Sequence, residues 1–275
     1  ILSTFVILSG CTNGLISSPD QENNLPATVS NNIKTDESFN YDGYEQILNL
    51  YVNDDGLVNY EKLQENRQQL DNFNKAIGEV SSETYQNWTD SQKLAFLINA
   101  YNAFTLQSII DKTPIPSSIR NIPGVWKWRK FTVAGQEKTL DNIEHDTIRK
   151  EFNEPRIHVA LVCAAISCPP LRNEPYTAEK LDQQLDDQVK KFIDGSHGFS
   201  LDESQGTVYL SSIFQWYGVD WIKNYSVKDK FKGSEKERSV LNFLSNYFPS
   251  DQQKYLRQGN YKIQYLNYDW SLNKQ

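Results

Sequence analysis

The stretch that decides the fold is R-I-H-V-A-L-V-C-A-A-I-S-C-P-P-L-R, residues 156–172. Its apolar run, residues 157–162, is short and rich in β-branched side chains, which predicts a buried β-strand at the centre of a small sheet. The loop after this run ends at two prolines, which exclude both helix and strand pairing. It carries the polar and reactive side chains Cys163, Ser167, Cys168 and Arg172. Because side chains at the end of a buried strand often form a site, we expect a functional site in the loop 163–172.

The composition narrows the class of protein. A chain of 275 residues that is 38% hydrophobic and 23% charged can bury a core and is not embedded in a membrane. Its net charge of −7, without any basic stripe, argues against a nucleic acid partner. The 15 tyrosines and 6 tryptophans are numerous enough to predict that some of them line a groove, where a ring with a polar tip is useful.

The N-terminal residues are typical of a secreted lipoprotein. Residues 1–8 are apolar and too short to span a bilayer, and with 9–10 they predict the end of a truncated signal peptide. Leu8-Ser9-Gly10-Cys11 resembles a bacterial lipobox, which predicts cleavage before Cys11 and lipidation of its thiol. The alternative is an ordinary signal peptide with a chance cysteine. We therefore expect an extracytoplasmic protein whose partner is the membrane, through a lipid anchor on Cys11.

Two segments of different character follow the lipobox. Residues 11–40 are dominated by Asn, Ser, Pro, Asp and Gly without periodicity, which predicts a disordered tether. From Tyr41 onward apolar residues recur at helical spacing. No repeat and no second linker interrupts residues 41–275, so they are predicted to form a single globular domain.

Helices are predicted to dominate this domain. Two capping boxes, beginning at Thr89 and Ser234, predict helices that reach about Asp111 and Phe248. Thr139 and Thr177 are expected to cap two more helices, the first of which reaches about Phe152. Short strands are predicted at 157–162, 207–210 and 261–266. The expected fold is α+β, mostly helical around a small β-sheet.

Several polar residues in these elements are candidate site residues. Asn99 and Asn102 are neighbours on one face of the helix that begins after Thr89, where they either hold the backbone of a neighbouring loop or contribute to a site. Asp141, His145 and Arg149 are spaced by four along their helix, so Asp141 either orients the His145 ring or forms a solvated pair with it.

His158 and Arg172 also allow two interpretations each. His158 is either a neutral hydrogen-bonded core residue or a base. Arg172 is either a ligand for a carboxylate or phosphate group or an anchor for its own loop.

Four blocks of the chain resemble the family called domain of unknown function 547. They are K-L-A-F-L-I-N-A-Y-N-A-F-T-L at 93–106, L-D-N-I-E-H-D-T-I-R at 140–149, R-I-H-V-A-L-V-C-A-A-I-S-C-P-P-L-R-N-E-P-Y at 156–176, and Y-L-N-Y-D-W-S-L-N at 265–273. One departure, Leu97-Ile98, stands where the family more often has an aromatic residue first. The resemblance extends from about Tyr41 to the C-terminus and implies a single domain, but it implies no reaction.

Three kinds of chemistry remain open for the site. In the first, Cys163 or Cys168 is a nucleophile, His145 or His158 is its base, and Asp141 or an asparagine orients the ring, as in papain-like and transglutaminase-like enzymes. In the second, the two cysteines form a disulfide that shapes a binding rim. In the third, a metal is bound by His145, His158, Glu144 and a thiolate.

We favour the second alternative. The expected function is a lipid-anchored binding or scaffold module for a small molecule, peptide or protein, with Asn99, Asn102, Glu144 and Arg172 as candidate binding residues. No cofactor and no metal is expected. A cysteine-nucleophile hydrolase or acyltransferase is the alternative, so the sequence leaves open whether the protein is an enzyme.

Overall fold

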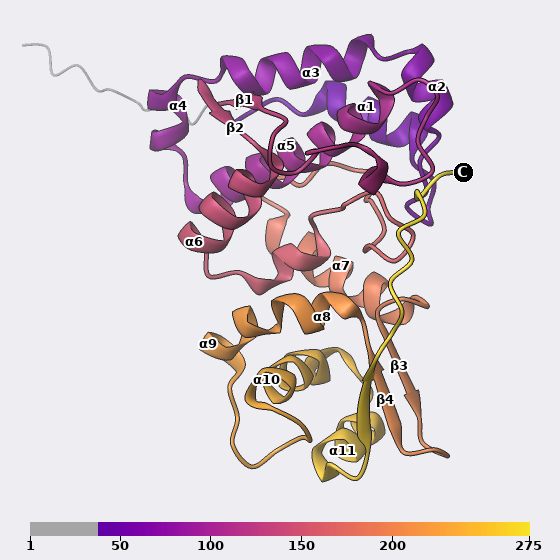
Figure 1. Ribbon diagram of the computed structural model, residues 1–275. Coiled ribbons are helices and arrows are strands. Elements are labelled where there is room, and N and C mark those ends of the chain that lie inside the picture. The colour runs from indigo at the N-terminus through magenta and orange to yellow at the C-terminus, as the bar shows by residue number, and fades with distance from the viewer. Residues whose placement is uncertain (1–37) are drawn as a thin grey trace, which may run out of the picture. The chain divides into compact units, whose positions relative to one another are not determined.

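The centre of the fold is helix α5 (Asp90–Ile110), almost all of whose side chains are buried in the computed structural model. The structure describes residues 38–275 (Figure 1). Helix α5 begins with the predicted capping box: the Thr89 hydroxyl accepts from the Gln92 amide, and the Gln92 side chain accepts from the Thr89 amide. A helix that is apolar all round has to be covered on every side, so the remaining elements are arranged around it.

The first hydrophobic cluster surrounds α5. Between residue 38 and α5, the structure has four helices: α1 (Asp42–Tyr51), α2 (Tyr60–Glu65), α3 (Gln68–Glu79) and α4 (Ser82–Asn87). Tyr44 of α1 stacks on Phe73 of α3 with ring centroids 4.4 Å apart. The hairpin of β1 (Phe131–Val133) and β2 (Gln136–Lys138) adds Phe131, which stacks on Phe104 of α5 at 4.2 Å. These contacts bury both the helices and the hairpin against one core.

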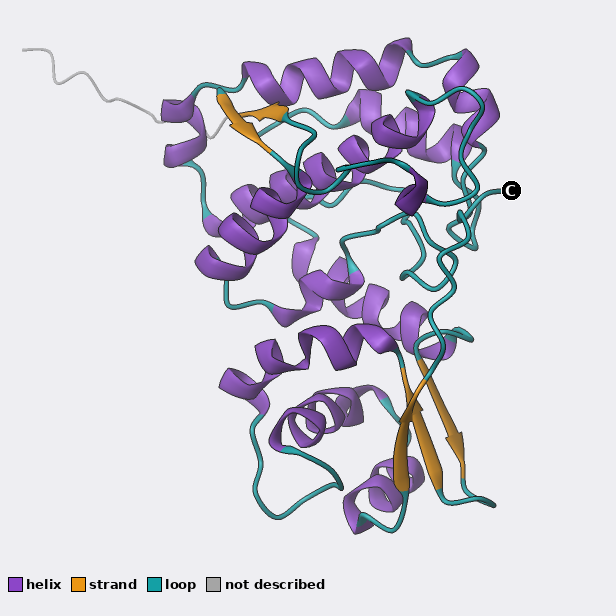
Figure 2. Ribbon diagram, viewed as in Figure 1, coloured by secondary structure: helices purple, strands orange, loops and turns teal. Residues whose placement is uncertain are grey.

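A second hydrophobic cluster lies in the C-terminal part of the chain. Here β3 (Phe199–Asp202) pairs antiparallel with β4 (Thr207–Leu210), which pairs in parallel with β5 (Lys262–Tyr265). In Figure 2 the orange strands β3, β4 and β5 lie beside several short helices. Both contribute apolar side chains to the second cluster, which includes the fully buried Trp221. These helices are α8 (Ser212–Tyr217), η4 (Gly218–Trp221), α9 (Ile222–Tyr225), α10 (Glu235–Leu244), η5 (Ser245–Tyr247) and α11 (Ser250–Gln258).

The α+β, mostly helical fold class is confirmed. The capping box at Ser234 opens α10 as predicted, and the strands predicted at 207–210 and 261–266 are β4 and β5. The prediction that Thr177 caps a helix is wrong, because α7 (Leu181–Asp194) begins four residues later. The Thr177 amide instead donates to the Gln184 side chain of α7 at 3.0 Å. The predicted signal peptide, Cys11 and residues 11–37 of the predicted tether lie outside the described residues. The tether was predicted to extend to residue 40, but Phe39 packs on Phe73 and Phe96 of the first cluster, so the last residues assigned to it belong to the folded domain.

The strand predicted at 157–162 is also wrong. Residues Pro155–Val159 form a 3-10 helix, η3, and the chain then continues without a strand partner to the disulfide loop. The run is deeply buried, as its β-branched side chains predict. Burial and composition therefore identified a core segment, but a short apolar run does not distinguish a strand from another buried conformation.

The backbone of this segment is satisfied by α5 instead of by a sheet. The Asn102 amide donates to the Ala160 carbonyl at 2.9 Å and accepts from the Val162 amide at 2.9 Å. In the same way, the Asn99 side chain donates to the Tyr176 carbonyl at 2.7 Å and accepts from the Tyr176 amide at 3.0 Å. Each side-chain amide thus occupies the place that a neighbouring strand would take.

Two arginines fix the ends of the same segment to α7. Arg156 binds Asp182 and Asp186 of α7, each at 2.7 Å, as well as Glu154. Arg172 pairs with Asp187 of α7 and with Glu174, each at 2.5 Å. The loop that carries the cysteines is therefore held at both ends by α7 and in the middle by α5.

The helix predicted after Thr139 is present but has an unusual pitch. The Thr139 hydroxyl accepts from the Asn142 amide at 3.1 Å, and η2 (Asn142–Ile148) is a π-helix that continues into α6 (Arg149–Glu151). A π-helix is often found at functional sites because it changes which side chains share a face. One more 3-10 turn, η1 (Ile119–Asn121), follows α5. Within residues 38–275, no helix is both long and apolar enough to cross a membrane.

Replacement of Asn102 by alanine should destabilise the protein. The change leaves the Ala160 carbonyl and the Val162 amide unpaired in the core, which is expected to lower the free energy of unfolding by roughly 2–5 kcal/mol. Urea denaturation monitored by circular dichroism measures the difference. The matched control is Asn72→Ala, on the exposed face of α3, which should change stability by less than about 0.5 kcal/mol. Equal stability of the two variants would show that the Asn102 amide does not support the loop.

Candidate functional site

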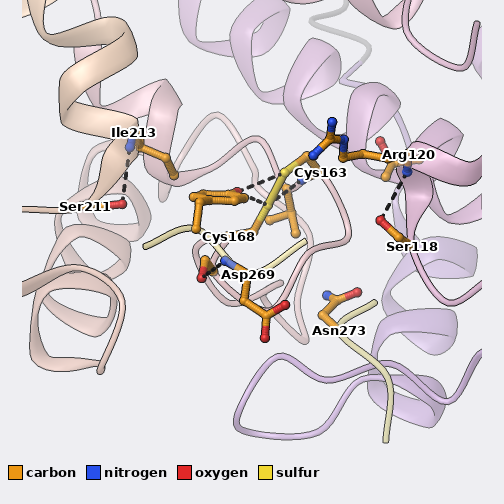
Figure 3. Close-up of a disulfide and its surroundings, with 12 residues drawn as sticks. Ser118, Arg120, Cys163, Cys168, Ser211, Ile213, Asp269 and Asn273 are labelled. Atoms are coloured by element: carbon orange, nitrogen blue, oxygen red, sulfur yellow. Dashed lines mark hydrogen bonds between the residues drawn. A yellow bond between two sulfur atoms is a disulfide. The ribbon is translucent and has the colours of Figure 1, made fainter. Parts of the chain in front are cut away.

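A disulfide between Cys163 and Cys168 closes the loop after η3 (Figure 3). The two Cα atoms are 6.3 Å apart, and the Cys163 amide donates to the Cys168 sulfur at 3.1 Å. The Tyr268 hydroxyl lies 3.2 Å from the Cys163 sulfur and 3.1 Å from the Cys168 sulfur. Because bonded sulfurs can only accept, this hydroxyl is the donor to both. Neither sulfur is a free thiol, so neither can act as a nucleophile while the disulfide is intact.

The C-terminal segment holds the disulfide loop in place. The Ile166 amide donates to the Ser271 carbonyl at 2.8 Å, and the Ser167 amide donates to the Asp269 carbonyl at 3.2 Å. In return, the Asp269 amide donates to the Ser167 hydroxyl at 2.8 Å. Figure 3 shows the disulfide between residues from separate parts of the chain, including Arg120, Ile213 and Asp269. The pairing places the aromatic rings near the C-terminus beside the cysteines.

The disulfide forms part of the lining of a pocket of about 280 Å³. The pocket lies where α5, the η2 helix, the η3 segment, α8 and the C-terminal segment meet. Its aromatic lining consists of Tyr101, Trp126, Trp216, Tyr217, Tyr268 and Trp270. Its ionisable lining, apart from the tyrosines, consists of Lys127, Asp141, Glu144, His145 and His158. An apolar pocket with a few convergent polar groups is the usual form of a small-molecule site.

A chain of charged hydrogen bonds runs behind one wall of the pocket. His158 lies 2.7 Å from one Asp220 oxygen through its Nε2 atom. Arg149 grips both oxygens of the same carboxylate, at 2.7 and 2.9 Å. The Arg149 guanidinium also donates to His145 Nδ1 at 3.0 Å, and His145 Nε2 faces Asp141 at 3.7 Å. Because an arginine can only donate, Nδ1 of His145 is the acceptor and the proton of the neutral ring is on Nε2.

Burial and hydrogen bonding together determine the protonation states of Asp220 and His158. Burial alone would raise the pKa of Asp220, but hydrogen bonds from His158 and Arg149 outweigh it and hold that pKa far below its usual value. Burial lowers the pKa of His158, and the hydrogen bond with Asp220 offsets only part of this effect. Asp220 is therefore a carboxylate and His158 a neutral imidazole near pH 7. The ring of His158 stacks on Tyr217 with centroids 4.2 Å apart, so Tyr217 covers one face of the imidazole.

Glu144 belongs to a second polar group on the same wall. Its carboxylate accepts from the Tyr101 hydroxyl at 3.2 Å. Burial and the nearby carboxylate raise the pKa of Tyr101, so its hydroxyl keeps its proton and remains a donor. The π-helix η2 presents Glu144 and His145 to one pocket although they are adjacent in sequence.

Four of the aromatic rings form a continuous wall. Tyr268 contacts both Trp270 and Trp216, with centroids 4.7 and 4.8 Å apart. Trp216 and Trp270 are nearly parallel at 6.0 Å, and Trp126 meets Trp270 edge-on at 6.2 Å. Trp216 is nevertheless 46% exposed. The wall is therefore supported from behind and open to solvent at the pocket.

The structure brings together six of the candidate residues from the sequence. Cys163, Cys168, His145, His158, Asp141 and Glu144 all line the pocket. The other three candidates, Asn99, Asn102 and Arg172, do not line it. Asn99 and Asn102 bind the backbone of neighbouring loops, and Arg172 pairs with Glu174 and with Asp187 of α7. Within residues 38–275, no three His, Cys, Asp or Glu side chains are gathered so as to hold a metal ion.

Several residues of the site were not singled out by the sequence. Asp220 lies in η4, far along the chain from both of its partners, and nothing in its local pattern marks it. Trp126, Trp216 and Trp270 come from three separate segments. The high aromatic content predicted a lined groove but not its members, and Trp270 was marked only by its place in the block 265–273.

Residues 85–193 match the model of the family described as "Protein of unknown function, DUF547". The matched segment contains the first three of the four sequence blocks, with α5, the η2 helix and the disulfide loop. The fourth block, at 265–273, lies outside it. Comparison with curated proteins and with solved structures found no match in either case.

Because His158 is buried, we expect the free energy of unfolding to fall in mild acid. Its ordinary pKa is 6.5, and the folded protein lowers it, so below about pH 6.5 the unfolded chain binds a proton that the folded protein does not. This group alone should therefore lower the free energy of unfolding by up to about 1.4 kcal/mol per pH unit as the pH falls from 6.5 towards the depressed pKa. In His158→Gln, urea unfolding between pH 7.5 and 5 should show a smaller dependence on pH. Parallel pH profiles for variant and wild type would contradict this assignment.

Proposed function

We propose that the protein is a binding module whose ligand occupies the aromatic pocket beside the Cys163–Cys168 disulfide. The observation that carries this proposal is the half-exposed Trp216, which stands in a supported ring wall at the mouth of a pocket with convergent polar groups. Large apolar rings that remain exposed beside a pocket are typical of ligand contacts. The binding role proposed here is for a small molecule, rather than for a peptide or protein.

The supports of the pocket favour a rigid site. The disulfide, the Tyr268 hydroxyl and the pairing of the loop with the C-terminal segment fix one wall. The Asp220 carboxylate fixes His158 and Arg149 on another. A pocket whose side chains are held before the ligand arrives loses less conformational entropy on binding.

Binding is preferred over cysteine catalysis for a chemical reason. A cysteine nucleophile has to be a thiolate with a base within hydrogen-bond reach. Here both sulfurs are joined to each other, and the Nε2 atom of the buried His158 is engaged with Asp220. The pocket as it stands offers surfaces and hydrogen bonds to a ligand but no free nucleophilic sulfur.

The proposal includes a location for the module. We place it outside the cytoplasm as a lipoprotein of bacterial type, anchored through a lipid on Cys11, because of the lipobox at residues 8–11. The disulfide supports this location, since such bonds persist mainly in oxidising compartments. Anchored in this way, the module would meet its ligand at a membrane surface.

Fragment binding tests the pocket. A ¹⁹F NMR panel of small ring compounds, balanced between neutral, cationic and anionic members, should yield binders to the wild-type protein. Trp216→Ala should weaken their binding about tenfold, because an aromatic contact is removed. The matched control is Trp128→Ala, which removes a ring that is 76% exposed and does not line the pocket, and it should bind as the wild type does. The proposal fails if no compound binds or if both variants bind them equally well.

Labelling with an alkyne analogue of palmitate tests the anchor. The protein with its own N-terminus, expressed in a bacterial host that processes lipoproteins, should take up the label and sediment with membranes. Cys11→Ala should do neither, because the acceptor thiol is missing. A double variant, Cys163→Ser with Cys168→Ser, controls for labelling at the other cysteines and should keep the label. Labelling that survives in Cys11→Ala would refute lipidation at this residue.

A further inference from the structure

The ring wall of the pocket presents its aromatic faces to a ligand from three separate segments of the chain. Trp126 precedes the β1–β2 hairpin, Trp216 lies in α8, and Tyr268 and Trp270 belong to the C-terminal segment. The face of an aromatic ring carries partial negative charge, so it attracts cations and weakly polarised C–H groups. We therefore expect a ligand that offers the rings either a positive charge or a flat face of C–H groups.

The charges around the wall decide between these two kinds of ligand. Among the described residues, the lining has two acidic side chains, Asp141 and Glu144, and one permanently positive side chain, Lys127. Just outside the lining, the Arg120 guanidinium covers the Trp270 ring at 5.3 Å from its centroid. Behind the wall, the ion pair of Asp220 and Arg149 adds one charge of each sign, so with His158 neutral three negative and three positive charges surround the pocket. This balance gives neither a cation nor an anion a clear advantage.

The hydrogen-bonding groups of the lining are mixed in the same way. The carboxylates of Asp141 and Glu144 can only accept, and Lys127 can only donate. The side chains of Asp141 and Glu144 are 30% and 10% exposed, so they are partly withdrawn from water. Glu144 already accepts from Tyr101, and the remaining acceptor sites of both carboxylates require polar partners in a filled pocket. A ligand that fills this site has to offer both donors and acceptors while remaining neutral.

We infer that the ligand is a saccharide, bound with a C–H face of its pyranose ring on the aromatic wall and its hydroxyls on Asp141, Glu144 and Lys127. This inference rests on the proposed binding function and names its ligand class. Sugar hydroxyls both donate and accept, and the axial hydrogens of an all-equatorial ring form a flat apolar face. The pocket volume of about 280 Å³ lies just below the usual range of about 300–1,000 Å³ for small-molecule sites, which fits one or two sugar rings.

Other ligand classes fit the lining less well. A phosphate or carboxylate group on the ligand would be repelled by the carboxylates of Asp141 and Glu144. The described lining offers such a group neither an arginine nor a series of backbone amide donors. A wholly apolar ligand would cover the two carboxylates without giving them hydrogen bonds. An organic cation would gain from the rings and the carboxylates but would be opposed by Lys127 and Arg120.

Titration with defined oligosaccharides tests the inference on the full chain. Cellotriose and triacetylchitotriose are the neutral probes with flat ring faces, tri-galacturonate is the anionic probe, and choline is the cationic probe. Saturation-transfer NMR and calorimetry should detect at least one neutral trisaccharide, with little or no binding of tri-galacturonate or choline. Trp216→Ala should weaken trisaccharide binding about tenfold, and Trp216→Phe, which retains a ring face, should recover part of it.

A second variant distinguishes hydrogen bonding from charge. Asp141→Asn keeps an acceptor oxygen and removes the negative charge, so trisaccharide binding should change by less than about threefold. If choline binds and Asp141→Asn abolishes its binding, the site takes cations and the saccharide inference is wrong. If the fragment panel occupies the pocket but neither trisaccharide binds, the binding function stands and only the ligand class is overturned.

Discussion

The structure depends on two side-chain amides of one buried helix. Asn99 and Asn102 lie three residues apart on α5, and each closes two hydrogen bonds with the backbone of a segment that has no sheet to join. A buried backbone that is unpaired is costly, so the segment 157–176 can be buried only because α5 carries these groups at this spacing. The position of the cysteines follows from this constraint, since the residues held by Asn102 immediately precede Cys163.

The pocket is also the place where the two hydrophobic clusters are tied together. Arg149 and His158 come from the part of the chain that surrounds α5, whereas Asp220 lies in η4 of the C-terminal part. The Asp220 carboxylate therefore binds both Arg149 and His158 across the boundary between the clusters. The His158 ring also stacks on Tyr217 of the C-terminal part. A partly buried carboxylate of this kind depends on its positively charged and hydrogen-bonding partners, so the same interaction that joins the clusters also fixes the shape of the pocket wall.

Local signals in the sequence were sufficient for the helices but not for the central segment. The capping boxes at Thr89 and Ser234 act within four residues, so they could be identified without knowledge of the tertiary structure. The run 157–162 failed as a strand because its conformation is decided by Asn102, some sixty residues away, and not by its own β-branched side chains. Two of the three histidines and both cysteines of the pocket could be proposed as site residues from their chemistry. Asp220 could not, because an aspartate in a short turn is ordinary until its partners are known.

The disulfide explains why the C-terminal segment belongs to the site. A loop closed between Cys163 and Cys168 is compact enough to present the Ile166 and Ser167 amides in a row, and the segment around residues 269–271 pairs with them. This pairing places the Tyr268 hydroxyl on both sulfurs and holds Trp270 against Trp216 of α8. The ring wall therefore depends on the closed loop, although none of its tryptophans is near the cysteines in sequence. Reduction of the disulfide would remove the closed loop with which the C-terminal segment pairs. The ring wall is therefore held in place only in the oxidised state.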